Sequence, residues 1–144
     1  MENGRLYKSF FLLIEEYINK VKSKNDIKVY LELLENSFND LKETTSFIFN
    51  KNKDNNEEIV STAVDYLRIF ALVSLGLVWV KYIEASINKN DSQKNNFYNA
   101  KIDTGNFFLR YILNETHSLK TKILAGAKLY NDYDNEYFDL GFNI

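Results

Sequence analysis

The chain has 144 residues, of which 45% are apolar, 15% are aromatic and 26% are charged, and it contains neither proline nor cysteine. A chain of this length is expected to form one domain with a sizeable hydrophobic core. The lack of cysteine excludes disulfide frameworks and thiolate metal sites, and the aromatic content argues against disorder. Its 18 basic and 20 acidic residues are mixed along the sequence, so no basic face is available for nucleic acid.

Two features bear on the cellular compartment. Residues 1–8 lead directly into an amphipathic pattern and do not resemble a secretory signal. The longest mostly apolar stretch, residues 69–80, has 12 residues between Arg68 and Lys81, whereas a membrane span needs about 20. We therefore expect a cytoplasmic protein in which this stretch is a buried helix and not a membrane span.

The first two predicted helices each carry a stripe of apolar residues at helical spacing. The first runs from Leu6 to about Lys22, and its stripe consists of Tyr7, Phe10, Ile14, Tyr17 and Val21. The second begins after Asp26, a residue type that often caps helices, and ends near Phe49. Its stripe consists of Ile27, Leu31, Leu34, Phe38, Leu41 and Ile48.

The third predicted helix is the most apolar segment of the chain. It follows a polar loop over residues 50–56, starts near Glu57 and Glu58, and extends to about Asn88. The two glutamates suit a helix N-terminus, which favours negative charge. Residues 72–80 are apolar on nearly every side, so we expect this helix to be central in the fold.

A second polar loop, residues 89–96, precedes a fourth helix that we expect to end near Thr116. Its stripe consists of Tyr98, Ile102, Gly105, Leu109 and Ile112. Polar breaks of this length suit antiparallel neighbours, so the sequence predicts an all-α fold, an up-down four-helix bundle forming one domain over residues 1–144. We expect a short extra helix over residues 119–129, across the bundle, and an acidic, aromatic tail over residues 130–144.

Little in the sequence supports catalysis. The single histidine, His117, lies near the expected end of the fourth helix, and its offset from Glu115 does not match the Glu-x-x-His pattern of dimetal bundles. Adjacent carboxylates such as Glu15 and Glu16 point about 100° apart on a helix. The five glycines are scattered and form no phosphate loop. We therefore assign no catalytic, cofactor-binding or metal-binding residue.

Polar residues and glycines inside the apolar helices are more informative. Asp65 and Arg68 are three residues apart at the entrance to the apolar stretch, and we expect a structural ion pair between them. Three residues of the fourth helix can join this network, namely Lys101, Asp103 and Arg110.

Gly76 and Gly105 lie in mid-helix, where glycine costs about 1 kcal/mol relative to alanine. The usual reason for such a glycine is the close approach of another helix, and we expect one at each position. Trp79, one turn from Gly76, is expected to fill the adjoining core.

Several motifs follow one another between residues 64 and 126. They are Asp65-Tyr66-Leu67-Arg68-Ile69-Phe70-Ala71, Gly76 with Trp79, Phe97-Tyr98-Asn99-Ala100-Lys101 with Phe107 and Phe108, Leu113-Asn114-Glu115, and Ala125-Gly126. In this order they resemble the C-terminal helical domain of large acyl-CoA dehydrogenases, and the two preceding amphipathic helices match its layout. The chain departs from the family pattern at Ala71, where glycine is usual, at Gly105 and Asn106, which replace small residues, and at Asn114, which replaces proline.

The resemblance implies a structural role. In that family, FAD and the catalytic carboxylate belong to other parts of the enzyme, so we expect this chain alone to bind no cofactor and not to oxidise acyl-CoA. We expect it to pack on the catalytic core of an acyl-CoA dehydrogenase or to form a homo-oligomer. The candidates for structural and interface contacts are Asp65, Arg68, Gly76, Trp79, Lys101, Gly105, Phe107, Phe108 and Arg110.

The chain also has more aromatic residues than one bundle seam accommodates, and exposed aromatics typically mark a partner surface. They include Phe10, Phe11, Phe107, Phe108, Tyr111, Tyr130, Tyr133, Tyr137, Phe138 and Phe142. The alternative function is a free-standing helical interaction protein that binds a partner through exposed aromatics and the acidic tail. A frayed terminus is the other interpretation of the tail.

Overall fold

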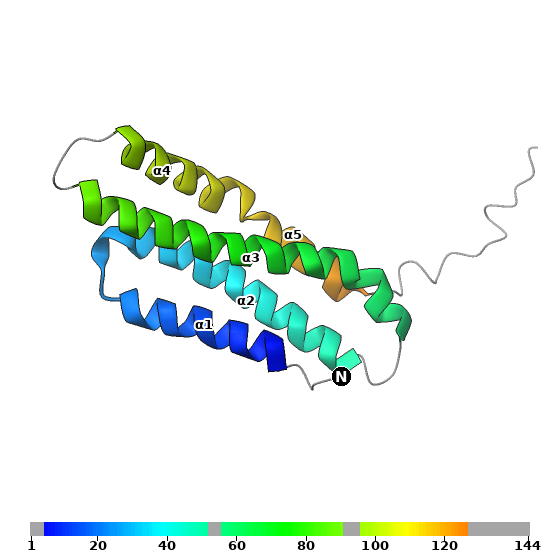
Figure 1. Cartoon of the computed structure of the whole chain (residues 1–144). Coiled ribbons are helices and arrows are strands. Elements are labelled where there is room, and N and C mark those ends of the chain that lie inside the picture. Colours follow the sequence, from blue (N-terminus) through cyan, green and yellow to red (C-terminus); the bar gives the residue numbers. More distant parts are fainter. Residues whose placement is uncertain (1–4, 52–55, 91–95, 127–144) are drawn as a thin grey trace, which may run out of the picture.

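The computed structural model describes residues 5–51, 56–90 and 96–126, and the secondary structure in these ranges is helical. The elements are α1 (Arg5–Val21), the 3-10 helix η1 (Asn25–Ile27), α2 (Lys28–Lys51), α3 (Asn56–Asn90), α4 (Asn96–Phe107), the π-helical segment η2 (Phe108–Ile112) and α5 (Glu115–Ala125). Figure 1 shows α1, α2 and α3 as neighbouring rods, with α4 and α5 arranged end to end as a fourth rod. The predicted all-α four-helix bundle is confirmed.

The predicted stripes of α1 and α2 face the core. In α1, Ile14 and Val21 are buried, and the aromatic members of the stripe are half-buried. In α2, every predicted stripe residue is buried except Ile48, which is half-buried. Aromatic contacts fix α1 against its neighbours, since Phe10 stacks on Phe70 of α3 with ring centroids 4.6 Å apart.

The start of the second helix differs from the prediction. Asp26 lies inside η1 and is exposed, and α2 begins two residues later at Lys28. The residue in the N-cap position of η1 is Lys24, which makes no side-chain capping bond. The tighter 3-10 turn places Ile27 in the core, where it is only 1% exposed, so burial and not capping determines this boundary.

The prediction of one continuous fourth helix to Thr116 is wrong. After α4 the backbone widens into a π turn, in which the amide of Leu113 donates to the carbonyl of Phe108 at 2.9 Å. This turn adds a residue to the helical repeat and directs Phe108, Leu109 and Leu113 into the core. The expected extra helix is α5, which starts at Glu115 and continues the fourth rod instead of crossing the bundle.

The break also changes the position of His117, and part of the expected C-terminal structure cannot be compared. His117 lies exposed in the first turn of α5, and not at the C-terminal end of a helix. Residues 127–129 of the expected extra helix and the tail over residues 130–144 lie outside the described residues.

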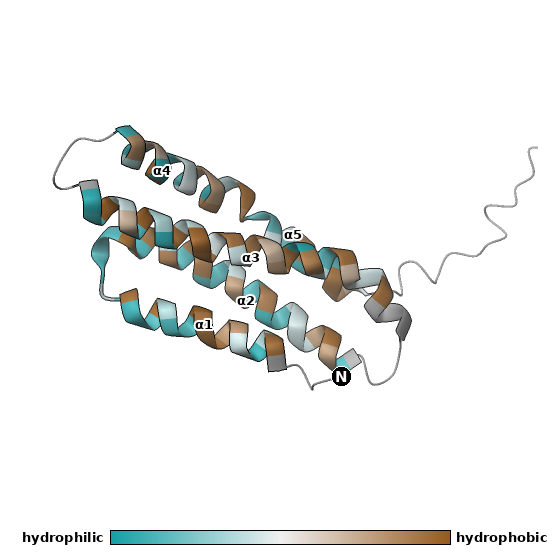
Figure 2. Ribbon diagram, viewed as in Figure 1, coloured by the Kyte–Doolittle hydropathy of each residue, from teal (hydrophilic) through white to brown (hydrophobic). Residues whose placement is uncertain are grey.

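The third helix is less enclosed than predicted. α3 packs against α2, α4 and α5, and it buries Ile69, Val73, Val80 and Ile83. Its opposite face is also apolar but remains exposed, because a helix in a four-helix bundle has neighbours on only part of its circumference. Figure 2 shows hydrophobic positions recurring along the length of α3. The exposed large residues are Val60, Val64, Leu67, Leu75, Val78 and Tyr82.

By length and composition alone, α3 could also cross a membrane. The qualifying span is Val60–Lys89, with a mean hydropathy of 1.8, and the core helix of a soluble protein can pass the same test. Packing against the bundle explains the apolar residues of its inner face. The apolar residues of its outer face require a different explanation.

Candidate functional site

Arg68 pairs with Glu115 of α5, and not with Asp65 as predicted. Its Nε and Nη2 donate to the two carboxylate oxygens of Glu115 at 2.6 and 2.8 Å. This two-point bond raises the pKa of Arg68 and lowers the pKa of Glu115. The geometry explains the choice of partner, because a guanidinium matches a carboxylate best when two parallel N–H bonds form. Asp65 acts on Arg68 only through its charge.

The predicted extension of this network along the fourth rod is also wrong. The ammonium of Lys101 lies over the ring of Phe97, 5.5 Å from its centroid. Arg110 donates from Nε to Oδ1 of Asn106 at 2.7 Å. Both contacts remain within the fourth rod, and Asp103 is exposed on the same rod without an ion pair among the described residues.

The two mid-helix glycines do mark close approaches of other helices, as predicted. A Cβ at Gly76 would lie 3.2 Å from Leu113, and a Cβ at Gly105 would lie 2.8 Å from Ile83. Trp79 is half-buried and packs between α3 and the fourth rod. Its ring lies against Gly105, and its centroid is 6.2 Å from that of Phe108.

The fourth rod presents an exposed aromatic pair. The rings of Phe107 and Tyr111 stack with centroids 5.2 Å apart, and the two residues are 56% and 74% exposed. Phe108, between them in sequence, is buried, while Phe10 and Phe11 of α1 are half-buried. The expectation that some aromatics are exposed is therefore confirmed for Phe107 and Tyr111. The aromatics of the tail lie outside the described residues.

A polar cluster joins α2 to α5, and sequence patterns did not indicate it. Lys120 Nζ lies 2.6 Å from Asp40 Oδ1 and 3.1 Å from Glu43 Oε2, and Thr116 donates to Asp40 Oδ2 at 3.2 Å. Asp40 is only 9% exposed, and its bond to Lys120 raises the pKa of that ammonium. The sequence signal that could have indicated this cluster was the position of Asp40 between two residues of the apolar stripe, Phe38 and Leu41.

A second polar cluster fixes the opposite end of the bundle. Tyr17 of α1 and Lys24, in the turn after it, donate to the two oxygens of Glu84 at 2.8 and 2.7 Å. Burial, reinforced by the bond to Glu84, raises the pKa of Tyr17. Burial alone would raise the pKa of Glu84, but the bonds from Lys24 and Tyr17 outweigh it and hold that pKa below its usual value.

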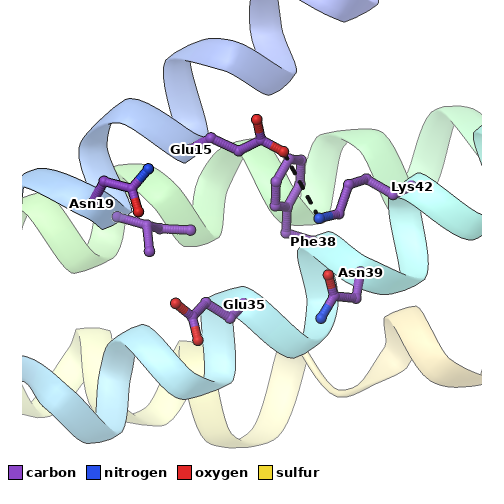
Figure 3. Close-up of a pocket in the computed structure, with 7 residues that line it drawn as sticks. Glu15, Asn19, Glu35, Phe38, Asn39 and Lys42 are labelled. Carbon is purple, nitrogen blue, oxygen red and sulfur yellow. Dashed lines mark ion pairs between the residues drawn. The ribbon is translucent and has the colours of Figure 1, made fainter. Parts of the chain in front are cut away.

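Two of the surface grooves are lined mainly by polar residues. Figure 3 shows the one between α1 and α2, about 340 Å³ in volume, with Glu15 and Asn19 on one wall and Glu35, Asn39 and Lys42 on the other. Lys42 lies 3.8 Å from a Glu15 oxygen and 4.6 Å from the Phe38 ring centroid. The cation of this groove is thus already engaged by an anion and an aromatic face.

Another groove, between α2 and α5, contains the Asp40 cluster and His117, and has a volume of about 410 Å³. The ammonium group in this groove belongs to Lys120 and is paired with the carboxylates of Asp40 and Glu43. Within the described ranges, no group of three or more His, Cys, Asp or Glu residues could hold a metal ion. The Asp40 and Glu84 clusters join α2 to α5 and α1 to α3.

These features define a helical-bundle domain whose exposed apolar residues are suited to contact with another surface. A family model described as acetyl-CoA dehydrogenase C-terminal like matches residues 10–134. The match spans most of the sequence, and the chain belongs to this family, which confirms the resemblance found over residues 64–126. No curated protein matches the chain.

Proposed function

We propose that the chain is the C-terminal helical domain of an FAD-dependent acyl-CoA dehydrogenase, that it packs on the catalytic core, and that it supports subunit association. The observation that carries the proposal is the family match over residues 10–134. It is supported by the exposed apolar residues of α3 and by the Phe107–Tyr111 pair, because an isolated domain rarely leaves so much apolar surface in water.

The proposal includes the absence of catalysis by this chain alone. A general acid or base must be able to exchange a proton with a substrate. Glu115 is instead bonded to Arg68 through both oxygens, and Glu84 accepts bonds on both of its oxygens. These contacts support a structural role for the polar groups.

The proposal also states that this chain alone binds no flavin. The pyrophosphate of FAD requires N–H donors or cations that are free to bind it. The groove between α1 and α2 has Glu15 and Glu35 on its walls, and its Lys42 lies on Glu15. In the groove between α2 and α5, Asp40 and Glu43 hold Lys120. Both grooves therefore favour a cation over a phosphate.

The test is co-expression with an acyl-CoA dehydrogenase core encoded beside this chain. We expect the two to copurify, and we expect the core and not this chain to carry flavin absorbance and acyl-CoA oxidation. Isolation of the chain without any core, or turnover of an acyl-CoA by the chain alone, contradicts the proposal. Cell fractionation tests the cytoplasmic location that the proposal implies.

The aromatic pair can be tested in the same experiment. A variant with Phe107→Ser and Tyr111→Ser is expected to lose copurified core if the pair contacts it, because exposed aromatics are strong interface anchors. The matched control is Leu12→Ser with Leu13→Ser, which removes exposed apolar residues from α1. Circular dichroism confirms that both variants remain helical.

The alternative function is a free-standing interaction protein with another partner. The exposed Phe107–Tyr111 pair favours it as well, and its second element is the acidic tail over residues 130–144. Deleting the tail separates the two functions. Loss of a partner other than a dehydrogenase core, with unchanged helical content, supports the alternative, whereas an unchanged set of copurifying proteins contradicts it.

A further inference from the structure

The outer face of α3 carries a continuous row of apolar residues, which we name the α3 stripe. Each of its seven members is exposed to solvent. At 3.6 residues per turn, they lie within about 80° of one another around the helix axis. The members are Val60, Val64, Leu67, Ala71, Leu75, Val78 and Tyr82.

The stripe is symmetric about its centre. Leu67 and Leu75 lie four residues on either side of Ala71. Val64 and Val78 lie seven residues on either side of it, and Val60 and Tyr82 lie eleven residues away. Leucine therefore matches leucine and valine matches valine in the two central pairs, and the outermost pair matches a valine with a tyrosine.

We propose that the α3 stripe binds a second copy of this chain, with the two α3 helices antiparallel and a two-fold axis passing beside Ala71. In such a contact, residue i meets residue j while j meets i, so the interface must be complementary to itself. The two central pairs meet this condition with identical residues, and the outermost pair meets it with two apolar residues of different size. This inference rests on the proposed role in subunit association and names the surface that performs it.

The geometry of the stripe suits a long helix-to-helix contact. Its spacing repeats every 11 residues, or about 3.67 residues per turn, so the stripe stays nearly straight along the helix. From Val60 to Tyr82 it extends about 33 Å. The small side chain of Ala71 lies at the centre, where the two helix axes come closest, and interhelical distances of about 8 Å require small residues there.

The exposed area is close to what a specific dimer needs. The six large members are between 43% and 78% exposed. Aromatic side chains bury about 150–250 Å² each and valine and leucine bury less, so these exposed fractions offer at most about 600 Å² per copy. A standard interface buries about 800 Å² per partner, so the stripe with its flanking residues reaches the lower part of that range. We expect a dissociation constant in the micromolar range for the isolated chain.

Charges at the edge of the stripe are compatible with this arrangement. The stripe itself contains no charged residue. Arg68 lies three residues from Ala71, so the two-fold axis brings the two copies of Arg68 near each other. Glu115 is bonded to each guanidinium at 2.6 and 2.8 Å and offsets their repulsion.

A different occupant does not require the symmetry. A bilayer surface or an unrelated protein can cover apolar residues in any order along a helix. An isologous contact requires that positions at equal distances from its centre be complementary, and pairs of apolar residues of equal size meet this requirement. The matched pairs therefore favour a second copy over both of these occupants.

Single cysteines test the arrangement directly, because the natural chain contains none. We expect Ala71→Cys to form a disulfide-linked dimer under mild oxidation. Val60→Cys alone should not do so, since its two copies lie about 33 Å apart, but it should cross-link when mixed with Tyr82→Cys. Ala100→Cys, exposed on α4, is the matched control. Cross-linking of Val60→Cys to itself indicates parallel helices and overturns the proposal.

Charge substitutions provide a second test, by sedimentation equilibrium of the full chain. Leu67→Glu and Leu75→Lys should each weaken the dimer more than about tenfold, because each places two desolvated charges in the contact. An equimolar mixture of the two should associate again, since the introduced carboxylate of one copy then faces the introduced ammonium of the other. Leu12→Glu on α1 is the control, and circular dichroism verifies folding.

The outcomes are distinguishable from those of the proposed function. A wild-type chain that stays monomeric at high micromolar concentration overturns the α3 dimer, as does a dimer unaffected by Leu67→Glu. Cosedimentation of the monomer with phosphatidylcholine vesicles assigns the stripe to a membrane and also overturns it. In each case copurification with a dehydrogenase core can still be observed. A failure to copurify contradicts the proposed function, whichever result the dimer experiments give.

Discussion

Ile83 lies so close to Gly105 that a methyl group added to this glycine would be 2.8 Å from both Cγ1 and Cδ1 of the isoleucine. Trp79, one turn before Ile83 on α3, restricts the same space at 3.1 Å. Gly105→Ala gains about 1 kcal/mol of helix propensity but forces two packed side chains to move. We expect a net loss of about 1–2 kcal/mol in the free energy of unfolding, measured by urea denaturation.

Gly76→Ala is the matched comparison. Its added methyl group would lie 3.2 to 3.4 Å from Leu113 and Leu34, where a small rotation of the leucines relieves the contact. We expect its free energy of unfolding to change by less than about 1 kcal/mol, because the gain in helix propensity offsets the strain. Equal losses for the two alanine variants would show that the distance to Ile83 does not determine the outcome.

Lys120 compensates a carboxylate that is almost completely buried. Replacing it by methionine keeps the aliphatic length and leaves Asp40 bonded only to Thr116. Lys120→Met is expected to reduce the free energy of unfolding by about 1–3 kcal/mol, the loss typical of a hydrogen bond to a buried charged group. Chemical denaturation measures it, with Lys122→Met, on the exposed side of α5, as the control.

A double variant identifies the cause of this loss. Asp40→Leu combined with Lys120→Met removes both charges, so it should be destabilised by less than the sum of the losses of Asp40→Leu and Lys120→Met measured singly. Additive losses would mean that the residues act independently and that their 2.6 Å contact contributes nothing.

Periodicity was sufficient to predict the helices but not their junctions. The stripes of α1 and α2 are local patterns, and residues such as Ile14 and Leu34 are buried as that pattern requires. The break in the fourth rod depends on a π turn at Phe108, and Leu113, at the end of this turn, packs beside Gly76 of α3. A contact between residues so far apart in sequence cannot be derived from the local pattern.

The candidate site shows the same division. Gly76 and Gly105 were interpretable because a mid-helix glycine has one common structural cause. The partner of Arg68 was not, since Asp65 and Glu115 are both compatible with its charge. Only the beginning of α5 at Glu115, a consequence of the break, brings that carboxylate to the guanidinium.

The ion pair of Arg68 is expected to contribute little to stability. Its two side chains are 59% and 37% exposed, so water and salt screen their attraction. Arg68→Gln should leave the midpoint of thermal unfolding unchanged within error. Its effect on the proposed α3 dimer should be no larger than that of the control variant Leu12→Glu. A clear drop in that midpoint would assign the pair a structural role comparable to that of Lys120.

Glu84 makes the stability of the bundle depend on pH in the acid range. Its pKa is lower in the folded chain than the usual 4.5, so the folded state favours the ionised form. The stabilisation is therefore present above that value and is lost as the pH falls through the lower pKa of the folded state. Glu84→Gln should cost about 1–2 kcal/mol at neutral pH and should flatten the decline of stability below about pH 5. Glu16→Gln, exposed on α1, is the control, and an unchanged acid decline in Glu84→Gln would show that other carboxylates control it.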